Sequence, residues 1–239
     1  MPLPKIATPT YELELPSTGQ TIQYRPFLVK EEKLLVLALE GEDVKEITTA
    51  IKNVIKACIQ TKGIKVDTLP TFDIEYLFLN IRGKSVGEEL EVKLLCPDDN
   101  ETYVPVTIPI DEIGILKNDD HTNKIKLDAN LMMEMKYPSL SEFIKNNFDF
   151  GGDATMDQSF DLISSCVDKI YNEEEVWAAA DCTKKEITSF LESMNTNQFK
   201  EIEKFFETMP KLSHKVKITN PNTKVESEVV MEGLSSFFG

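Results

Sequence analysis

The chain is poor in the residues that most catalytic and metal sites need. It has 239 residues but only two histidines, 10 glycines and four cysteines. The cysteines, Cys58, Cys96, Cys166 and Cys182, include no close pair, which predicts reduced thiols rather than disulfides or a zinc site. The few glycines leave little material for loops that wrap phosphate groups. We therefore expect no metal and no cofactor.

Long apolar runs and clustered positive charges are also missing. The longest apolar run, Leu34 to Leu39, is far shorter than the roughly 20 residues that cross a bilayer. The first residues, Met1 to Lys5, lack the layout of a signal peptide, so we expect the protein to stay in the compartment where it is made. The net charge is −15 and no stretch collects lysine and arginine, which argues against nucleic acid and anionic membrane as partners. The negative charge either keeps the surface solvated or meets a basic partner.

The remaining candidates for catalysis are weak. Neither His121 nor His214 lies in a recognisable nucleophile motif, so we expect surface histidines. The segment Arg82-Gly83-Lys84-Ser85 resembles the end of a phosphate-binding loop, but Phe78 stands where that loop needs its first glycine. Paired carboxylates such as Glu173-Glu174-Glu175 are adjacent in sequence and do not converge on a cleft. We expect the protein not to be an enzyme.

Alternating apolar residues predict two hairpins near the N-terminus. The first runs from Tyr11 to Arg25 around Pro16-Ser17-Thr18-Gly19. The second runs from about 88 to 110 around Cys96-Pro97-Asp98-Asp99-Asn100. Both turns are rich in residues that favour tight turns.

The strands that follow carry two further signals. Pro105 and Pro109 lie in the return strand of the second hairpin, which places that strand at a sheet edge, where a missing amide costs little. Alternation from Ile125 to Met135 is unbroken and predicts one long strand.

Helical signals in the same region occur at three places. Residues 43–62 place their apolar side chains on one face, and Asp43 with Glu46 resembles a capping box. Residues 73–82 begin with acids and end with Arg82, as the helix dipole favours. The run from Leu34 to Leu39 predicts a short buried helix, with a strand as the alternative.

From residue 138 onward the pattern predicts helices. Capping boxes open two of them, at Ser139 and at Thr183, and apolar spacing predicts two more at about 156–171 and 199–209. A third hairpin follows, and its turn is Asn220-Pro221-Asn222-Thr223. The chain ends in Gly233-Leu234-Ser235-Ser236-Phe237-Phe238-Gly239, whose aromatic pair either packs in the chain's own core or docks on a neighbour.

The turns of the second and third hairpins echo each other. Cys96-Pro97 corresponds to Asn220-Pro221, and the first turn has the outline of a zinc knuckle. Asp99 stands where that knuckle needs a second cysteine. Convergence on turn-forming residues explains the echo, and a distant duplication is the alternative. We expect the turn at Cys96 to be free of metal, with the remnant of a metal site as the alternative.

Several stretches resemble the T4-type tailed-phage baseplate protein family, specifically its hub subunit and hub assembly protein. The resembling stretches are Tyr24-Arg25-Pro26-Phe27 with Lys30-Glu31-Glu32-Lys33, Asp73-Ile74-Glu75 through Arg82 to Ser85-Val86-Gly87, Phe190-Leu191-Glu192-Ser193, Phe205-Phe206-Glu207-Thr208-Met209-Pro210-Lys211-Leu212, and Glu232-Gly233-Leu234 to Phe237-Phe238. The resemblance implies a part in building the baseplate hub of a contractile tail in the host cytoplasm, with other baseplate hub proteins as partners. It implies no catalytic residues, and it leaves open whether the protein stays in the virion tail.

Together these signals predict an α+β fold. Residues 1–137 form a hairpin- and strand-rich region with two or three helices, and residues 138–239 form a helical region closed by a β-hairpin and an aromatic tail. Exposed hairpin edges would add strands to a partner's sheet, and an acidic helical surface would orient association. The predicted partner-binding residues are Phe237, Phe238, Leu234, Pro221, Pro105 and Pro109.

Two other functions remain as alternatives. A tail-associated cell-wall hydrolase would need a convergent acid pair or a metal site. An acidic inhibitor that mimics nucleic acid would occupy a basic partner and would lose its binding as salt is added.

Overall fold

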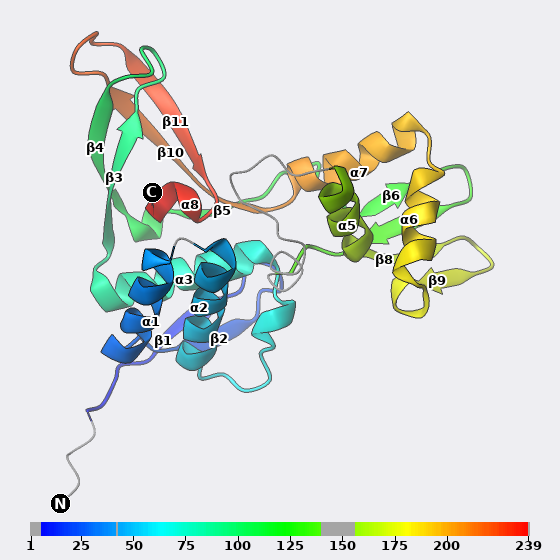
Figure 1. Ribbon diagram of the computed structural model, residues 1–239, viewed down its shortest axis with the longest axis horizontal. Coiled ribbons are helices and arrows are strands. Elements are labelled where there is room, and N and C mark those ends of the chain that lie inside the picture. Colours follow the sequence, from blue (N-terminus) through cyan, green and yellow to red (C-terminus); the bar gives the residue numbers. More distant parts are fainter. Residues whose placement is uncertain (1–5, 42, 140–155, 239) are drawn as a thin grey trace, which may run out of the picture. The chain divides into compact units, whose positions relative to one another are not determined.

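The computed structural model describes residues 6–41, 43–139 and 156–238, and helices and strands are interspersed along this chain (Figure 1). Its contacts divide into two compact units. Unit 1 contains Met1–Leu116 and Lys211–Gly239, and unit 2 contains Lys117–Pro210. The terminal hairpin is thus grouped with the N-terminal residues rather than with the helices that precede it.

The predicted fold class is wrong in how it distributes helices and strands. The structure is α+β with antiparallel sheets, but the helices after residue 138 are interleaved with two strands, β8 (Val167–Tyr171) and β9 (Val176–Ala178). The last two strands, β10 (Lys211–Thr219) and β11 (Glu226–Glu232), follow every described helix except the four-residue α8 (Ser235–Phe238). Val167 and Ile170 fit helical spacing, but these β-branched residues pair with a neighbouring strand instead.

Unit 1 begins with the predicted first hairpin and three helices. These elements are β1 (Tyr11–Glu14), β2 (Thr21–Tyr24), α1 (Val29–Glu40), α2 (Val44–Cys58), η1 (Val66–Thr68) and α3 (Thr71–Val86). The Asp43 carboxylate caps α2 by accepting hydrogen bonds from the Lys45 and Glu46 amides. The helix ends before the predicted residue 62, because Arg25 and Gln60 donate backbone hydrogen bonds that join residues 58–60 to β2.

The remainder of unit 1 contains two long hairpins and a short C-terminal helix. Its elements are β3 (Glu89–Leu95), β4 (Tyr103–Pro109), η2 (Ile110–Glu112), β5 (Gly114–Leu116), β10 (Lys211–Thr219), β11 (Glu226–Glu232) and α8 (Ser235–Phe238). β3 pairs with β4, and β10 lies between β11 and β5, all antiparallel. The core of these elements is made of Leu79, Leu90, Leu94, Cys96, Ile108, Ile110, Ile113, Leu212, Val216, Ile218, Met231 and Phe237.

A buried carboxylate joins the first hairpin to α3. The Asp73 carboxylate, in the first turn of α3, accepts hydrogen bonds from the Ser17 amide at 3.0 Å and from the Ser17 hydroxyl. Ser17 lies in the turn between β1 and β2, so this contact orients the hairpin on the helix.

In the described residues of unit 2, three α-helices pack with a four-stranded antiparallel sheet. Its elements are β6 (Lys124–Lys126), β7 (Met132–Met135), α5 (Met156–Cys166), β8, β9, η3 (Ala179–Asp181), α6 (Lys184–Glu192) and α7 (Thr196–Thr208). The strand order is β6-β7-β8-β9. Its core is formed by Ile125, Leu127, Met133, Met135, Leu162, Ile163, Cys166, Val167, Ile187, Leu191, Ile202 and Phe205.

The long strand predicted from Ile125 to Met135 is wrong. The structure divides it into β6 and β7, which pair with each other as a hairpin. The Asp128 carboxylate accepts hydrogen bonds from the Asn130 amide at 2.7 Å and the Leu131 amide at 2.8 Å, which closes the turn. Asp and Asn favour such turns, and the apolar alternation hid them.

Two other expectations have simpler outcomes. The capping box of α6 is confirmed, because the Thr183 hydroxyl and the Glu186 carboxylate each accept a hydrogen bond from the other's backbone amide. The helix predicted to open at Ser139 lies outside the described residues. Of the helices that the structure describes, none has the length and apolar character needed to cross a membrane.

Candidate interaction surface

The base of α1 is fixed by a buried ion pair. The Arg25 guanidinium lies 3.1 Å from the Glu31 carboxylate, which also accepts the Leu28 amide at 2.7 Å and so caps the helix. Burial disfavours the charged carboxylate, but the hydrogen bonds from Arg25, Leu28 and Lys30 hold the pKa of Glu31 below its usual value. Movement of the start of α1 would break this pair and leave a buried charge unpaired, which is strongly destabilising. The pair therefore fixes where α1 begins.

The outer surface of α1 is apolar and open to solvent. α1 packs against α2 (Figure 1), and Ala38 of α1 is buried. Five large side chains are between 48% and 80% exposed, and we call them the α1 surface: Val29, Leu34, Val36, Leu37 and Leu39. The prediction of a helix is confirmed here, but the prediction that it is buried is wrong.

Leaving these aliphatic side chains of α1 in water is unfavourable in free energy. Covering one aliphatic side chain of this size is worth about 1.5–3 kcal/mol. A helix that is apolar on most of its circumference is normally buried, and a group of neighbouring exposed apolar residues marks a contact site. Leu34 with Leu37 form one pair spaced by three residues, and Val36 with Leu39 form another about 200° around the helix, so exposed apolar side chains lie on more than one face of α1. The α1 surface is therefore the strongest candidate for a protein contact in unit 1.

The predicted partner-binding prolines lie in two hairpins. Pro105 is exposed and Pro109 half-buried in β4, which pairs only with β3 among the described strands. β4 therefore lies at a sheet edge, as the prolines predicted. Pro221 is exposed in the turn between β10 and β11. The structure does not bring these prolines and the aromatic tail into one surface, and their partner binding stays a prediction.

The predicted aromatic anchor is enclosed by its own chain. Phe237 is 2% exposed and belongs to the core of unit 1, which is the first of the two alternatives for this ring. Leu234 is half-buried, and its amide donates a hydrogen bond to the Glu75 carboxylate at 3.1 Å. The side chain of Phe238 lies outside what the structure describes. Phe237 could anchor a partner only if α8 left this core.

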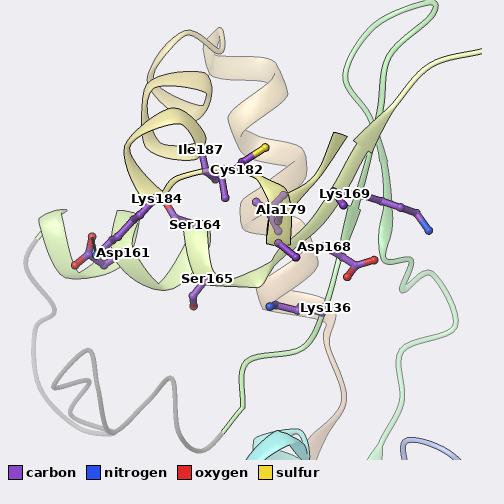
Figure 2. A pocket seen from close by; sticks show the side chains of 13 residues that line it. Lys136, Asp161, Ser164, Ser165, Asp168, Lys169, Ala179, Cys182, Lys184 and Ile187 are labelled. Atoms are coloured by element: carbon purple, nitrogen blue, oxygen red, sulfur yellow. Dashed lines mark ion pairs between the residues drawn. The ribbon is translucent and has the colours of Figure 1, made fainter. Parts of the chain in front are cut away.

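Unit 2 contains a pocket of about 550 Å³ near α5, β8 and the start of α6 (Figure 2). Its charged lining residues include Lys184, which lies 2.7 Å from Asp161, and Lys169, which forms an ion pair with Glu134. The Ser165 hydroxyl donates to the Leu162 carbonyl at 2.7 Å. These polar groups make contacts with their neighbours, and no lining residue is a histidine that could activate a serine.

The histidines occupy structural positions in the described residues. The ring nitrogens of His121 lie 2.9 Å from the Thr208 hydroxyl and 3.0 Å from the Tyr137 hydroxyl, and burial lowers the pKa of His121. His214 lies 3.1 Å from the Glu112 carbonyl. Both are half-buried, so they are more enclosed than the sequence predicted.

The glycine of the rejected phosphate-loop motif has a packing role. Gly83 is buried in α3, and a Cβ atom there would meet the Ile110 side chain at 3.0 Å. Glycine at this position lets η2 lie close against the helix. This contact accounts for the glycine without a phosphate ligand.

Comparison with known proteins decides the family. The model of a family described as T4 bacteriophage base plate protein matches residues 8–239, nearly the whole chain. The chain belongs to this baseplate family. No curated protein and no solved structure matched it. It is thus a phage baseplate protein, which points to other baseplate proteins as partners and to the virion tail as its location.

The sequence contained a signal for the α1 surface that its interpretation missed. The run from Leu34 to Leu39 has no polar residue, so more than one full turn of this helix has apolar side chains on every side. The pattern of this run predicted a helix buried in the chain's own core. In a protein that works in an assembly, the same pattern also predicts a contact with another subunit.

Proposed function

We propose that this baseplate protein is a non-enzymatic component or assembly factor of the baseplate hub and acts through protein–protein contacts. The observation that carries the proposal is the α1 surface, a helix fixed at its base but uncovered on its outer side. Membership of the baseplate family supplies the kind of partner, another baseplate protein. An apolar groove on that partner would cover the helix. Removing the exposed apolar side chains from water would then contribute favourable free energy to binding.

Acidic helices in unit 2 support a second, orienting contribution. Between Asn172 and Glu207 there are nine acids and four lysines. Glu192 in α6, and Glu201 and Glu203 in α7, are exposed. Charges at the rim of an interface speed and orient encounter more than they strengthen the final complex. We therefore expect added salt to slow association, while the apolar contact through α1 keeps most of its strength.

Adding charge to the α1 surface should abolish the contact. The double variant Leu34→Glu and Leu37→Glu places two carboxylates in the proposed apolar interface, where each costs several kcal/mol unless it is paired. We expect recovery of baseplate proteins with the tagged chain to fall at least about 100-fold, which corresponds to a loss of about 3 kcal/mol. The measurement is affinity purification from infected cells followed by mass spectrometry.

A matched control is available in the same unit. Leu116 is 53% exposed, as Leu37 is, and lies opposite Lys211 at the edge of the sheet. The variant Leu116→Glu should leave recovery of the baseplate proteins unchanged. If the α1 double variant keeps its native far-UV spectrum and still recovers the same proteins, α1 is not the contact.

The same purification distinguishes the proposed roles. Hub proteins in the eluate, together with the chain in purified particles, would identify a structural subunit. Hub proteins without retention in particles would identify an assembly factor that departs. Recovery of baseplate proteins from outside the hub would overturn the hub assignment. Clearing of bacterial cell walls by the purified chain, followed as turbidity, would overturn the non-enzymatic part of the proposal.

A further inference from the structure

The turns of the second and third hairpins share one backbone conformation. In each, the carbonyl of the first residue accepts a hydrogen bond from the amide four residues later: Cys96 from Asn100 and Asn220 from Lys224, both at 2.9 Å. Asn100 and Lys224 have φ angles of 53° and 65°, and they are the only non-glycine residues in the described chain with positive φ. The two turns are therefore similar in backbone structure as well as in sequence.

Backbone amides in both turns point at a side chain of the same turn. The Asn220 side-chain carbonyl accepts the Asn222 amide at 2.9 Å and the Thr223 amide at 3.4 Å. The Asp99 carboxylate accepts the Glu101 and Thr102 amides, both at 3.0 Å. Outer hydrogen bonds of this kind orient ligands around a bound metal. Here they orient an amide and a carboxylate.

The two turns face each other (Figure 1). The Asn220 amide nitrogen donates to Asp99 at 2.8 Å and to both Asp98 oxygens at 3.1 Å. The Thr223 hydroxyl donates to Asp98 at 2.5 Å. Asn220 is 1% exposed, so these bonds form an enclosed bridge between the tips of the two hairpins.

We propose that positions 96, 99, 220 and 223 are the four ligand positions of a two-knuckle zinc site, in which this chain has replaced the metal by hydrogen bonds. Structural zinc takes two pairs of ligands from facing turns, each pair separated by two residues. Cys96 with Asp99, and Asn220 with Thr223, have this spacing. Of these four residues only Cys96 has kept a zinc-binding thiol. Within the described ranges no group of three or more His, Cys, Asp or Glu side chains is placed to hold a metal ion.

The hydrogen bonds between the two turns link them as a bound zinc ion would, although most of the metal-binding side chains are gone. A zinc ion would tie the β3–β4 turn to the β10–β11 turn through four bonds. The Asn220 amide ties the same two turns by donating to carboxylates of the facing one. The link joins segments more than 100 residues apart, so it stabilises unit 1 where local turn formation cannot.

Restoring the ligands should create a metal site in the full-length chain. The triple variant Asp99→Cys, Asn220→Cys and Thr223→Cys completes four cysteines with the native Cys96. We expect it to bind one Zn²⁺ per chain, at least about 1,000-fold more tightly than the unaltered chain. Co²⁺ in place of zinc should give the absorption of a tetrahedral site with four thiolates.

A control with displaced cysteines makes the test specific. The variant Asp98→Cys, Glu101→Cys and Asn222→Cys adds as many thiols to the same turns at positions that are not the proposed ligands. It should bind Zn²⁺ at least about 100-fold more weakly than the first variant. Equal binding by both variants, or no Co²⁺ spectrum in the first, would overturn the proposal.

A second measurement covers the case in which the triple variant does not fold without metal. The milder double variant Asn220→Cys and Thr223→Cys keeps Asp99, whose carboxylate is also a zinc ligand. It should gain thermal stability when Zn²⁺ is added, whereas the unaltered chain should not respond. If neither variant is folded or stabilised by Zn²⁺, the four positions do not converge as ligands and the proposal fails.

Discussion

Replacing Phe237 with alanine should lower the free energy of unfolding of unit 1 by about 3–5 kcal/mol. The ring is 2% exposed and lies in the core shared by α3, the two long hairpins and α8. Removing it leaves a cavity that the short helix α8 is poorly able to close, since α8 has only four residues. Denaturant unfolding measures the change, together with hydrogen exchange in β3 and β10.

The control for this prediction is an exposed residue of the neighbouring strand. Val230 in β11 is exposed, and Val230→Ala should change stability by less than about 0.5 kcal/mol. The opposite pattern would also be informative. If Phe237→Ala leaves the isolated chain as stable as before but prevents recovery of baseplate proteins, the aromatic tail is a partner anchor after all.

The elements that sequence patterns predicted well are those whose signals are local. The capped helix α2 and the long hairpin β10–β11 have their caps, turns and apolar faces within a few residues of one another. In α2 and in the β10–β11 hairpin, the residue propensities and the apolar pattern favour the same structure. Contacts with distant parts of the chain are therefore not needed to specify it.

The elements that were predicted wrongly depend on distant contacts. β8 became a strand because β7 and β9 lie on either side of it, and helical spacing in the sequence does not include those neighbours. The pairing of β6 with β7 depends on a turn at Asp128 that looked like part of a regular alternation. In both cases, pairing with a neighbouring strand determined the structure, against the spacing of apolar residues in the local sequence.

The candidate sites divide in the same way. The sequence showed that the turns at Cys96 and Asn220 are alike. It did not show that Asn220 contacts Asp98 and Asp99, because that contact forms only in the folded chain. It also showed an apolar run at Leu34, but not that the run would remain uncovered. Whether an apolar segment is a core or an interface depends on how much surface the rest of the chain can cover.

Replacing Glu75 with glutamine should stabilise unit 1 at alkaline pH. Burial raises the pKa of Glu75 to about 7, against the opposing effect of the hydrogen bond from the Leu234 amide. In the unfolded chain this carboxyl ionises near 4.5. The folded state therefore holds the proton more tightly, and the stability that this provides is complete below about pH 4.5 and is lost as the pH rises through about 7.

Glutamine keeps an oxygen for the Leu234 amide and carries no charge at any pH. At pH 8 the variant should be more stable than the unaltered chain by about 3 kcal/mol, and at pH 4 the difference should largely vanish. Thermal unfolding at a series of pH values measures this, with Glu91→Gln, an exposed residue of β3, as the control. An equal effect at pH 4 and pH 8 would show that the carboxyl does not titrate in this range.

Glu75 and Phe237 should also depend on each other. The Glu75 carboxylate accepts the Leu234 amide, and Leu234 packs against the core that contains Phe237, so we expect loss of the Phe237 ring to loosen the segment beside Glu75. In the Phe237→Ala background, water should reach the carboxyl and its pKa should fall toward the usual value. The gain from Glu75→Gln at pH 8 should then shrink to less than about 1 kcal/mol, a departure from additivity that a double-mutant cycle would measure.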